Sequence, residues 1–411
     1  NPDLLQAIAR IDQARARAFE INARLQPNIS AGGSGQRVQG SQVAGAFGTP
    51  PVPGTPEQQS IYELDLDASW EIDLFGRIRR RSEAAAAEIE AAEWDRRNLL
   101  VGISARVGIH YATIVALNKQ IPVAETLREA ALTAVDLTDR LLEAQLGSEE
   151  QGLLARSNLY TATAVLPPLY AARHAAAAQL AILVGRSPDK AISEFIAQAR
   201  GPIQLVEVKT GLPSELLLRR PDVRAAERTL AAATAAVGAE TADLYPSFQI
   251  ISRYGTQALS TDLIFRGASE TWSYGAFIRV PLFDRAQQKA DITAAEARAA
   301  AALAALDGAV LNALGETERA LTEYDSSVSR LNSLNQAARE QTKALELAHL
   351  RFSAGLESQL DVLNSQRRYL ALQFDAVQAK GDAFRAVVGA NLALGGGWEV
   401  AYQSANQARA H

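Results

Sequence analysis

The sequence lacks both cysteine and methionine over its 411 residues. Without cysteine the chain forms no disulfide framework, no thiolate zinc site and no thiol nucleophile. The absence of methionine indicates that the sequence does not begin at a translation start, so we expect a signal peptide or a lipid-bearing cysteine ahead of Asn1. It also lacks any run of eighteen apolar residues, which predicts no transmembrane helix. A membrane role must therefore come from β-strands.

Histidine is scarce as well, and acidic residues outnumber basic ones. The net charge is −5, the pI is about 5.6 and no basic stripe with interleaved aromatic residues occurs, which argues against a nucleic-acid binder. The four histidines are scattered without the spacing of metal ligands: His110, His174, His349 and His411. No nucleophile lies in a pattern with a general base. We therefore predict neither an enzyme nor a bound metal or cofactor.

The clearest pattern in the sequence runs from Tyr62 to Phe75. The even-numbered positions of this stretch are apolar: Tyr62, Leu64, Leu66, Ala68, Trp70, Ile72 and Leu74. The odd-numbered positions are mainly acidic: Glu63, Asp65, Asp67, Glu71 and Asp73. Alternation with a period of two predicts one long strand over about 61–75, with an apolar face and an acidic face. Directly afterwards, the sequence predicts a helix from about Ile78.

Three further segments are strand candidates, over 28–39, 247–259 and 270–281. In the last of them, apolar residues alternate with polar or small ones, and the apolar set includes Trp272 and Tyr274. The stretch 43–57 is rich in glycine and proline and predicts an exposed loop. The chain thus offers four strands.

Long helices account for most of the remaining sequence. An opening helix is expected over 2–25, and a much longer one from about 78 to 146, which Pro122 should kink or interrupt. A return helix ends near Gly185. A second long helix, from 284 to about 352, would measure about 100 Å, far more than a globular core needs.

The second long helix has a seven-residue apolar repeat. Its members are Leu303, Val310, Thr317, Tyr324, Leu331, Ala338, Leu345 and Phe352. This repeat predicts packing in the manner of a coiled coil. A displaced set, Leu311, Leu314, Leu321 and Val328, adds a second apolar flank. A helix with two apolar flanks suits the wall of a tube, where it has a neighbour on each side.

The sequence also repeats itself. Arg-Pro-Asp-Val at 220–223 restates Asn-Pro-Asp-Leu at 1–4, and Pro246 lies 219 residues after Pro27. Leu-Phe-Asp-Arg at 282–285 echoes Leu-Phe-Gly-Arg at 74–77, an offset of 208, and Gly355 has the same offset from Gly147. The pattern predicts a first structural repeat over 1–186, a connector over 187–220, a second repeat over 221–398 and a tail over 399–411.

Four strands cannot close a barrel by themselves, and open strand edges are not tolerated in lipid. Two chains would give eight strands, whose interior side chains fill, whereas three chains would give twelve and leave room for water. The acidic face would then line the pore, with Tyr62, Trp70, Trp272 and Tyr274 as candidates for the aromatic girdles. The alternative is a soluble sheet with one face in water.

Several motifs resemble those of the TolC-like outer-membrane factors of Gram-negative bacteria, in the branch that serves drug-efflux pumps. The most specific are Leu-Pro-Ser-Glu-Leu-Leu at 212–217, Arg-Arg-Pro-Asp-Val-Arg-Ala-Ala-Glu at 219–227, Glu-Ile-Asp-Leu-Phe-Gly-Arg at 71–77, Val-Pro-Leu-Phe at 280–283, the segment 355–363, and Leu-Gly-Gly-Gly-Trp at 394–398. Together they extend over essentially the whole chain.

The resemblance implies a mixed α and β membrane protein. Three copies would form a twelve-stranded barrel in the outer membrane, continuous with a periplasmic tunnel of twelve helices. Its expected partners are outer-membrane lipid, a periplasmic adaptor protein and an inner-membrane pump of the proton-driven RND type. The inner end would be closed at rest. Many relatives are acylated on an N-terminal cysteine, which makes a lipid anchor an expectation here too.

The resemblance also suggests functional residues. Asp361 matches a carboxylate that forms a ring at the periplasmic gate, Asn364 falls where some relatives hold a second carboxylate, and Phe352 and Gly355 belong to the same turn. The alternative for Asp361 is an ordinary anion at a helix N-terminus. In the first repeat, Leu153 occupies the position where the matching carboxylate is often found.

A cluster of arginines lies where strand becomes helix: Arg77, Arg79, Arg80, Arg81 and Arg285. At the level of the lipid headgroups these side chains would contact phospholipid, and a solvated charge run is the alternative. The sequence therefore favours an outer-membrane duct for drugs or other small molecules. Two alternatives remain, a type I protein-secretion duct and a soluble coiled-coil periplasmic adaptor.

Overall fold

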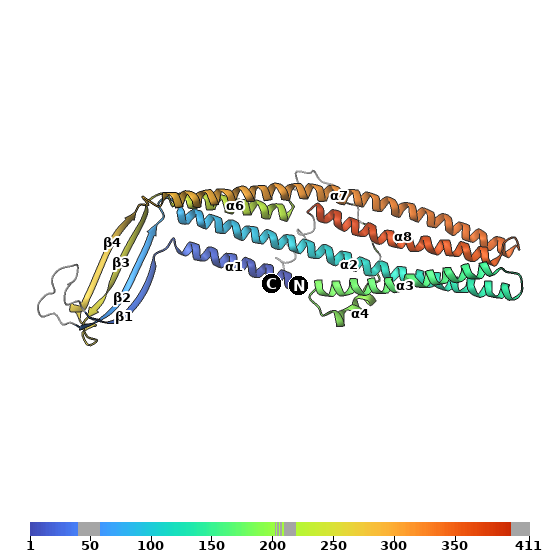
Figure 1. The fold of residues 1–411 in the computed structure, drawn as a ribbon, viewed down its shortest axis with the longest axis horizontal. Helices are drawn as coiled ribbons and strands as arrows, with labels where there is room; N and C mark the ends of the chain where they lie inside the picture. Colours follow the sequence, from blue (N-terminus) through green and yellow to red (C-terminus); the bar gives the residue numbers. More distant parts are fainter. Residues whose placement is uncertain (40–57, 202, 204, 206–207, 209–218, 396–411) are drawn as a thin grey trace. The chain divides into compact units, whose positions relative to one another are not determined.

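The computed structural model describes residues 1–39, 58–201, 203, 205, 208 and 219–395 (Figure 1). The predicted loop at 43–57, the whole family motif at 212–217, residues 396–398 of the closing motif and the tail at 399–411 lie outside the described residues.

Helices and strands occur in the same order in both halves of the chain. The first half contains α1 Pro2–Ala23, β1 Asn28–Gln39, β2 Gln58–Ile72, α2 Arg77–Glu143 and α3 Glu149–Leu183, followed by the short α4 Pro188–Gln198. The second half contains α6 Pro221–Ala242, β3 Ser247–Ala258, the 3-10 turn η2 Gly267–Ser269, β4 Glu270–Arg279, α7 Arg285–Ser353 and α8 Gln359–Ala393. Corresponding helices have nearly equal lengths: α1 and α6 have 22 residues each, and α3 and α8 have 35 each.

All four predicted strands are present and form one antiparallel sheet in the order β1-β2-β3-β4. The bounds of β1 agree with the prediction, whereas β3 and β4 end one and two residues early. The prediction for β2 is shifted, since the strand spans 58–72 and not 61–75. Its pairing with β3 ends at Ile72 opposite Phe248, so the alternation beyond Ile72 has no partner strand.

One close approach within the sheet requires a glycine. A Cβ atom built on Gly255 of β3 would lie 2.2 Å from the carbonyl oxygen of Leu64 on β2 and 2.9 Å from the Cα of Asp65. No other residue fits at that distance without separating the two strands, because real Cβ atoms do not approach so closely.

Of the two effects predicted for Pro122, a kink or an interruption, the interruption is wrong, because α2 continues through it. Proline removes one backbone hydrogen bond and costs roughly 3 kcal/mol inside a helix. Around it, however, α2 packs tightly, with Ile114, Val115, Ile121 and Ala124 no more than 4% exposed. Burial along the helix outweighs the local cost of the proline.

By length and composition alone, α2 and α7 are candidate membrane spans, although the sequence has no run of eighteen apolar residues. Each contains an eighteen-residue window of sufficient apolarity, with a mean hydropathy of 1.5 in α2 and 1.3 in α7. This is weak evidence for a span, because a helix that packs on its neighbours has the same composition. Of the window in α2, 33% is already buried inside the protein.

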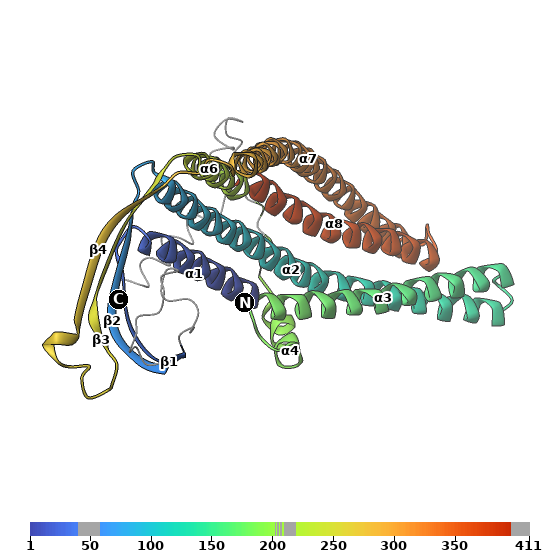
Figure 2. The same ribbon diagram turned by 60° about the vertical axis from the view of Figure 1, so that its left-hand side comes forward.

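By its packing the chain forms two compact units, and each takes segments from both halves of the sequence. One unit holds the sheet with residues 9–93 and 225–306. The other holds residues 1–8, 94–224 and the chain from 307 onward. In this second unit α2 lies alongside α3, and α7 alongside α8, as Figure 2 shows.

The second unit, residues 1–8, 94–224 and 307 onward, is called the helical unit below. Its core lies where α2, α3 and the α4 region meet. Buried residues there include Ile114, Ala177, Leu180 and Ala199. The predicted seven-residue repeat of α7 faces inward only in its central part, since Thr317 and Leu331 are buried but Leu303 and Phe352 are 49% and 43% exposed. The second predicted flank stays open, with Leu311 69% exposed.

Candidate functional site

The acidic face of β2 extends across the whole sheet. The pairing brings Ser30, Gly32 and Ser34 of β1, Arg253, Gly255 and Gln257 of β3, and Thr271, Ser273 and Gly275 of β4 onto the same face as Glu63, Asp65 and Asp67. Arg253 Nε donates to Asp67 Oδ1 at 2.7 Å, and Gln257 donates to Glu63 at 2.6 Å. Most of the remaining side chains on the face are small or polar, and Val38, Ile251 and Phe277 are among its larger apolar members. A surface of this composition suits water.

The opposite face of the sheet is apolar and exposed. Leu66 on β2 is 52% exposed, and Trp272 and Tyr274 on β4, beyond β3, are 68% and 80% exposed. The rings of Trp272 and Tyr274 stack with centroids 5.8 Å apart. Tyr62 and Trp70 lie on the same face, so all four predicted girdle residues share it. Their contact with lipid interfaces stays a prediction.

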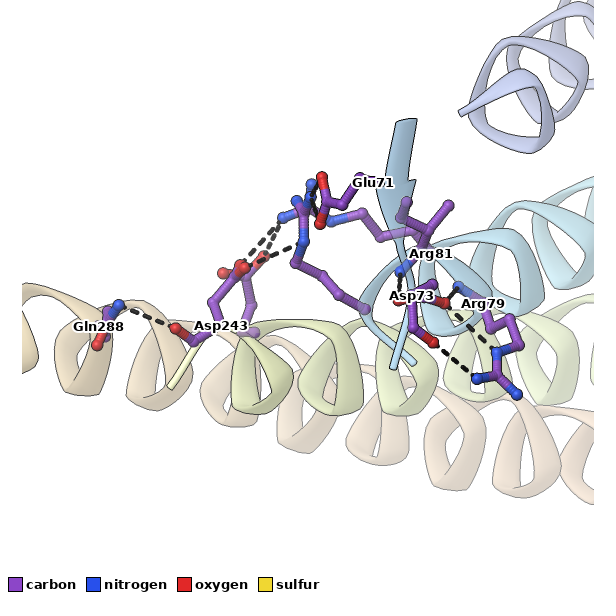
Figure 3. A network of polar contacts seen from close by, with 9 residues as sticks. Glu71, Asp73, Arg79, Arg81, Asp243 and Gln288 are labelled. Atoms are coloured by element: carbon purple, nitrogen blue, oxygen red, sulfur yellow. Dashed lines mark hydrogen bonds and ion pairs between the residues drawn. The ribbon is translucent and has the colours of Figure 1, made fainter. Parts of the chain in front are cut away.

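A network of charges joins the sheet to the helices, and Figure 3 shows it at close range. Arg77, the first residue of α2, pairs with Glu71 of β2 at 2.6 Å and with Asp243, just after α6, at 3.4 Å. Arg81 pairs with the same Asp243 at 3.2 Å, and Gln288 of α7 donates to the Asp243 carbonyl oxygen at 2.9 Å. Asp243 therefore connects the starts of both long helices.

Asp73 lies beyond the end of β2, and its carboxylate receives the first backbone N–H groups of α2. Ile78 N and Arg79 N donate to its two oxygens at 3.0 and 2.9 Å, and the side chain is only 8% exposed. An acidic side chain that accepts these otherwise unpaired donors stabilises the start of a helix. Asp73 is thus separated from the strand residues with which the sequence groups it.

The junction arginines have two kinds of surroundings. Arg77 and Arg81 are ion-paired within the protein and are 25% and 34% exposed. Arg79 and Arg80 pair with Asp73 and Glu83 but remain more than half exposed, and Arg285 is exposed at the start of α7. Phospholipid contact stays a prediction, better suited to these last three arginines than to the paired ones.

The turn between α7 and α8 holds the residues suggested for the gate. Gly355 has a φ of +75°, and Phe352 is 43% exposed beside it. Asp361 caps α8 in a reciprocal arrangement with Ser358: Asp361 N donates to Ser358 Oγ at 3.3 Å, while Ser358 N and Oγ donate to the Asp361 carboxylate at 3.2 and 2.7 Å. These donors lower the pKa of Asp361 below its ordinary value. The carboxylate is thus exposed, charged and fixed in direction.

The turn between α2 and α3 has the same construction. Gln145 takes the positive φ of 59°, and Ser148 and Gln151 form the matching capping box. Equivalent positions in the two turns are thus 210 residues apart, which corrects the offset of 208 between Gly147 and Gly355. The counterpart of Asp361 is Gln151, not Leu153. One turn therefore has a charged cap and the other a neutral one.

A model of the outer membrane efflux protein family matches residues 1–186 and 212–396. The chain belongs to the outer membrane efflux protein family. Among curated relatives, the pyoverdine export outer membrane protein OpmQ of Pseudomonas aeruginosa is 30% identical over 397 residues, which cover 97% of this chain and 83% of OpmQ. Outer membrane protein OprJ of the same species is 28% identical over 417 residues, 97% of this chain and 82% of OprJ.

The solved structure of the outer-membrane channel OprN has the same fold. It superposes with a TM-score of 0.84 at 33% sequence identity, over 97% of this chain and 88% of OprN. This efflux channel is therefore an outer-membrane duct of the Gram-negative type that extends into the periplasm, and its relatives are channels, not enzymes. The predicted family, function and location are confirmed, and the alternative of a soluble adaptor is wrong.

Some features of this efflux channel escape sequence reasoning. Asp243 and Arg81 are 162 residues apart, and nothing in either segment indicates that they meet. The capping boxes could have been found, because Ser-x-x-Gln at 148–151 and Ser-x-x-Asp at 358–361 follow glycine-containing turns. Among the described residues, no group of three or more histidine and acidic side chains is arranged to hold a metal.

Proposed function

We propose that three copies of the chain form one export channel, with a barrel of twelve strands and a tunnel of twelve helices. The observation that carries the proposal is the sheet. Within the described residues its outer strands β1 and β4 each have one unpaired edge, and its two faces differ sharply in polarity. Lipid does not tolerate open edges, so the edges must pair between copies.

The long helices support the same assembly. Leu311 and Leu314 of α7 are 69% and 40% exposed, and they form the flank that the seven-residue repeat leaves uncovered. Contiguous apolar side chains on a water-exposed helix are unfavourable unless a neighbour covers them. A helix from the next copy would bury this flank.

The register within the chain predicts the register between copies. Pro246 lies 219 residues after Pro27, so Arg253 of β3 is the equivalent of Ser34 of β1. Ser34 opposes Glu63 and Arg253 opposes Ser273, so Glu63 and Ser273 are equivalent as well. Because Glu63 also opposes Gln257 of β3, Ser273 should oppose the β1 residue equivalent to Gln257, which is Val38. Val38 of one copy would therefore lie beside Ser273 of the next.

We expect the double variant Val38→Cys, Ser273→Cys to form covalent dimers and trimers in the membrane, with no larger species. Directly opposed strand residues have Cα atoms about 4.5–5.5 Å apart, within the range that a disulfide bridges. The chain contains no cysteine, so every crosslink comes from the introduced pair. Non-reducing gel electrophoresis after mild oxidation measures the result.

The matched control is Ser30→Cys, Ser273→Cys. Ser30 lies on the same strand face as Val38 but eight residues away, about 26 Å along the strand. It should give no crosslink. A ladder that continues past the trimer, or a crosslink in the control and not in the first variant, would contradict the trimer or its register.

The hairpin turns are the proposed contacts with an adaptor and an inner-membrane pump of the RND type. Leu146 and Leu356 occupy equivalent positions in the two turns and are 78% and 70% exposed. Two exposed leucines at the same position of two turns with the same geometry suit a protein partner. We propose that docking there opens a constriction near Asp361, and that the cargo is small molecules, as the export of pyoverdine by OpmQ suggests. Co-purification with an inner-membrane transporter tests the partner.

A further inference from the structure

The helical unit contains a cavity of about 390 Å³ where α2, α3 and the end of α4 meet. The described residues that line it are Val115, Asn118, Lys119, Arg173, Ile196, Ala197, Ala199 and Arg200. Three of these side chains are cations and none is an acid. Exposed arginines elsewhere, such as Arg140 and Arg186, pair with a neighbouring carboxylate, whereas the cations of this cavity have no carboxylate in its lining.

Arg173 is held in this cavity by a specific set of hydrogen bonds. Its Nη1 donates to Asn118 Oδ1 at 3.1 Å, and Asn118 Nδ2 donates in turn to the carbonyl oxygens of Ile196 and Ala199 at 2.8 and 3.1 Å. Within the described part of the chain, Arg173 Nε is buried and has no acceptor. A donor that solvent cannot reach is closed to a ligand as well, but Arg173 Nη2 has no acceptor among the described residues and is not buried, so it is open to an acceptor that is not part of the protein.

The surroundings do not supply that acceptor. The carbonyls of Ile196 and Ala199 at the end of α4 would repel an anion, but the Asn118 amide already occupies them. Lys119 and Arg200 make no ion pair with any described residue and leave two further positive charges at the rim. The aliphatic wall of Val115 and Ala199 restricts water on the inner side and strengthens electrostatic attraction there.

We propose that this cavity binds a small oxyanion, the chemistry shared by inorganic phosphate and by the terminal carboxylate of a peptide. Arg173 donates from Nη2 to one oxygen, and Lys119 and Arg200 neutralise the remaining charge. Arginine suits this task because its planar fork matches carboxylate and phosphate oxygens. The cavity is larger than a bare phosphate and open to solvent, so the anion could be attached to a larger molecule.

Equilibrium dialysis of the full chain in detergent with radiolabelled inorganic phosphate tests the site. We expect saturable binding of one phosphate per chain. Arg173→Gln should weaken it about tenfold or more, because one charge-assisted hydrogen bond is lost. Lys119→Gln should weaken it less, and since Lys119 is exposed this variant does not depend on the folding of the Arg173 variant.

The matched control is Arg140→Gln, which removes one positive charge from an exposed pair with Asp136 and should leave binding unchanged. Competition with acetyl-alanyl-alanine separates the two sources of the anion: displacement at a lower concentration than unlabelled phosphate assigns a peptide carboxylate, and the reverse assigns phosphate. The proposal is overturned if neither probe binds saturably, or if binding survives in the double variant Arg173→Gln, Lys119→Gln. The outcome is independent of whether the channel is a trimer.

Discussion

Replacing Asp361 by glutamine is expected to lower the preference of the channel for potassium over chloride while leaving its resting conductance near that of the unmodified protein. In the proposed trimer, three copies of Asp361 surround the constriction, and a ring of carboxylates favours cations. An ion that passes 4 Å from one carboxylate in water gains about 1 kcal/mol, so loss of the ring should change selectivity about fivefold or more. Reversal potentials in planar bilayers measure it.

Glutamine is the appropriate substitution because the chain already uses it in the equivalent turn. Gln151 accepts from Ser148 N at 3.3 Å and forms the same capping box as Asp361. The exchange thus removes the charge and keeps the cap. Asp361→Ala removes both, and we expect it to raise the resting conductance in addition, because an uncapped α8 frays at its start.

The pH dependence supplies a second check on Asp361. Its pKa is lowered because the hydroxyl and backbone N–H of Ser358 donate to the carboxylate. The charge is therefore fully present above the ordinary carboxyl pKa and is lost only as the pH falls through the lower folded value. Selectivity should be constant between pH 7 and pH 5. A loss of selectivity in that range, or unchanged selectivity in Asp361→Gln, would assign the ring to other residues.

The strands were predictable because their pattern is local and their energetic requirement is simple. Alternating polarity fixes which side chains share a face, and the register then carries that division from β2 to the other three strands. The end of β2 was not predictable in the same way. Asp73 continues the alternation, but its partner strand has ended and its carboxylate is used at the start of α2.

The turn between α7 and α8 lies where the sequence places it, but the contacts of its residues depend on geometry that the sequence does not contain. Spacing alone aligns Asp361 with Leu153, whereas the positions of the two capping boxes align it with Gln151. Helix continuity through Pro122 and the Asp243 network likewise depend on contacts between distant segments, such as Arg81 with Asp243. Local propensity cannot report what tertiary packing supplies.

The largest loss of stability is expected from Arg220→Ala. This side chain is 8% exposed and joins three helices of the helical unit. It makes a two-point contact with Asp222 of α6 at 3.0 and 2.6 Å, an ion pair with Glu316 of α7 at 2.7 Å and a hydrogen bond to the Ala393 carbonyl at the end of α8 at 3.0 Å. Asp222 and Glu316 are 30% and 50% exposed and regain water when Arg220 is removed, so we expect a loss of about 2 kcal/mol, below that of a fully buried pair but above that of an exposed one.

Arg220→Lys should recover little of that loss, because one ammonium cannot reproduce a planar fork that reaches two carboxylates and a carbonyl. The control is Arg186→Ala, which breaks an exposed pair with Glu194 and should cost about 0–1 kcal/mol. Burial raises the pKa of Asp222, but the hydrogen bonds and charge of Arg220 lower it by more, so the pKa of Asp222 in the folded protein is below its ordinary value. The stabilisation is then complete above the ordinary carboxyl pKa and is lost as the pH falls through the folded value. Acid unfolding followed by circular dichroism should therefore occur at a higher pH in Arg220→Ala than in Arg186→Ala, and equal midpoints would mean that the network does not hold the helices together.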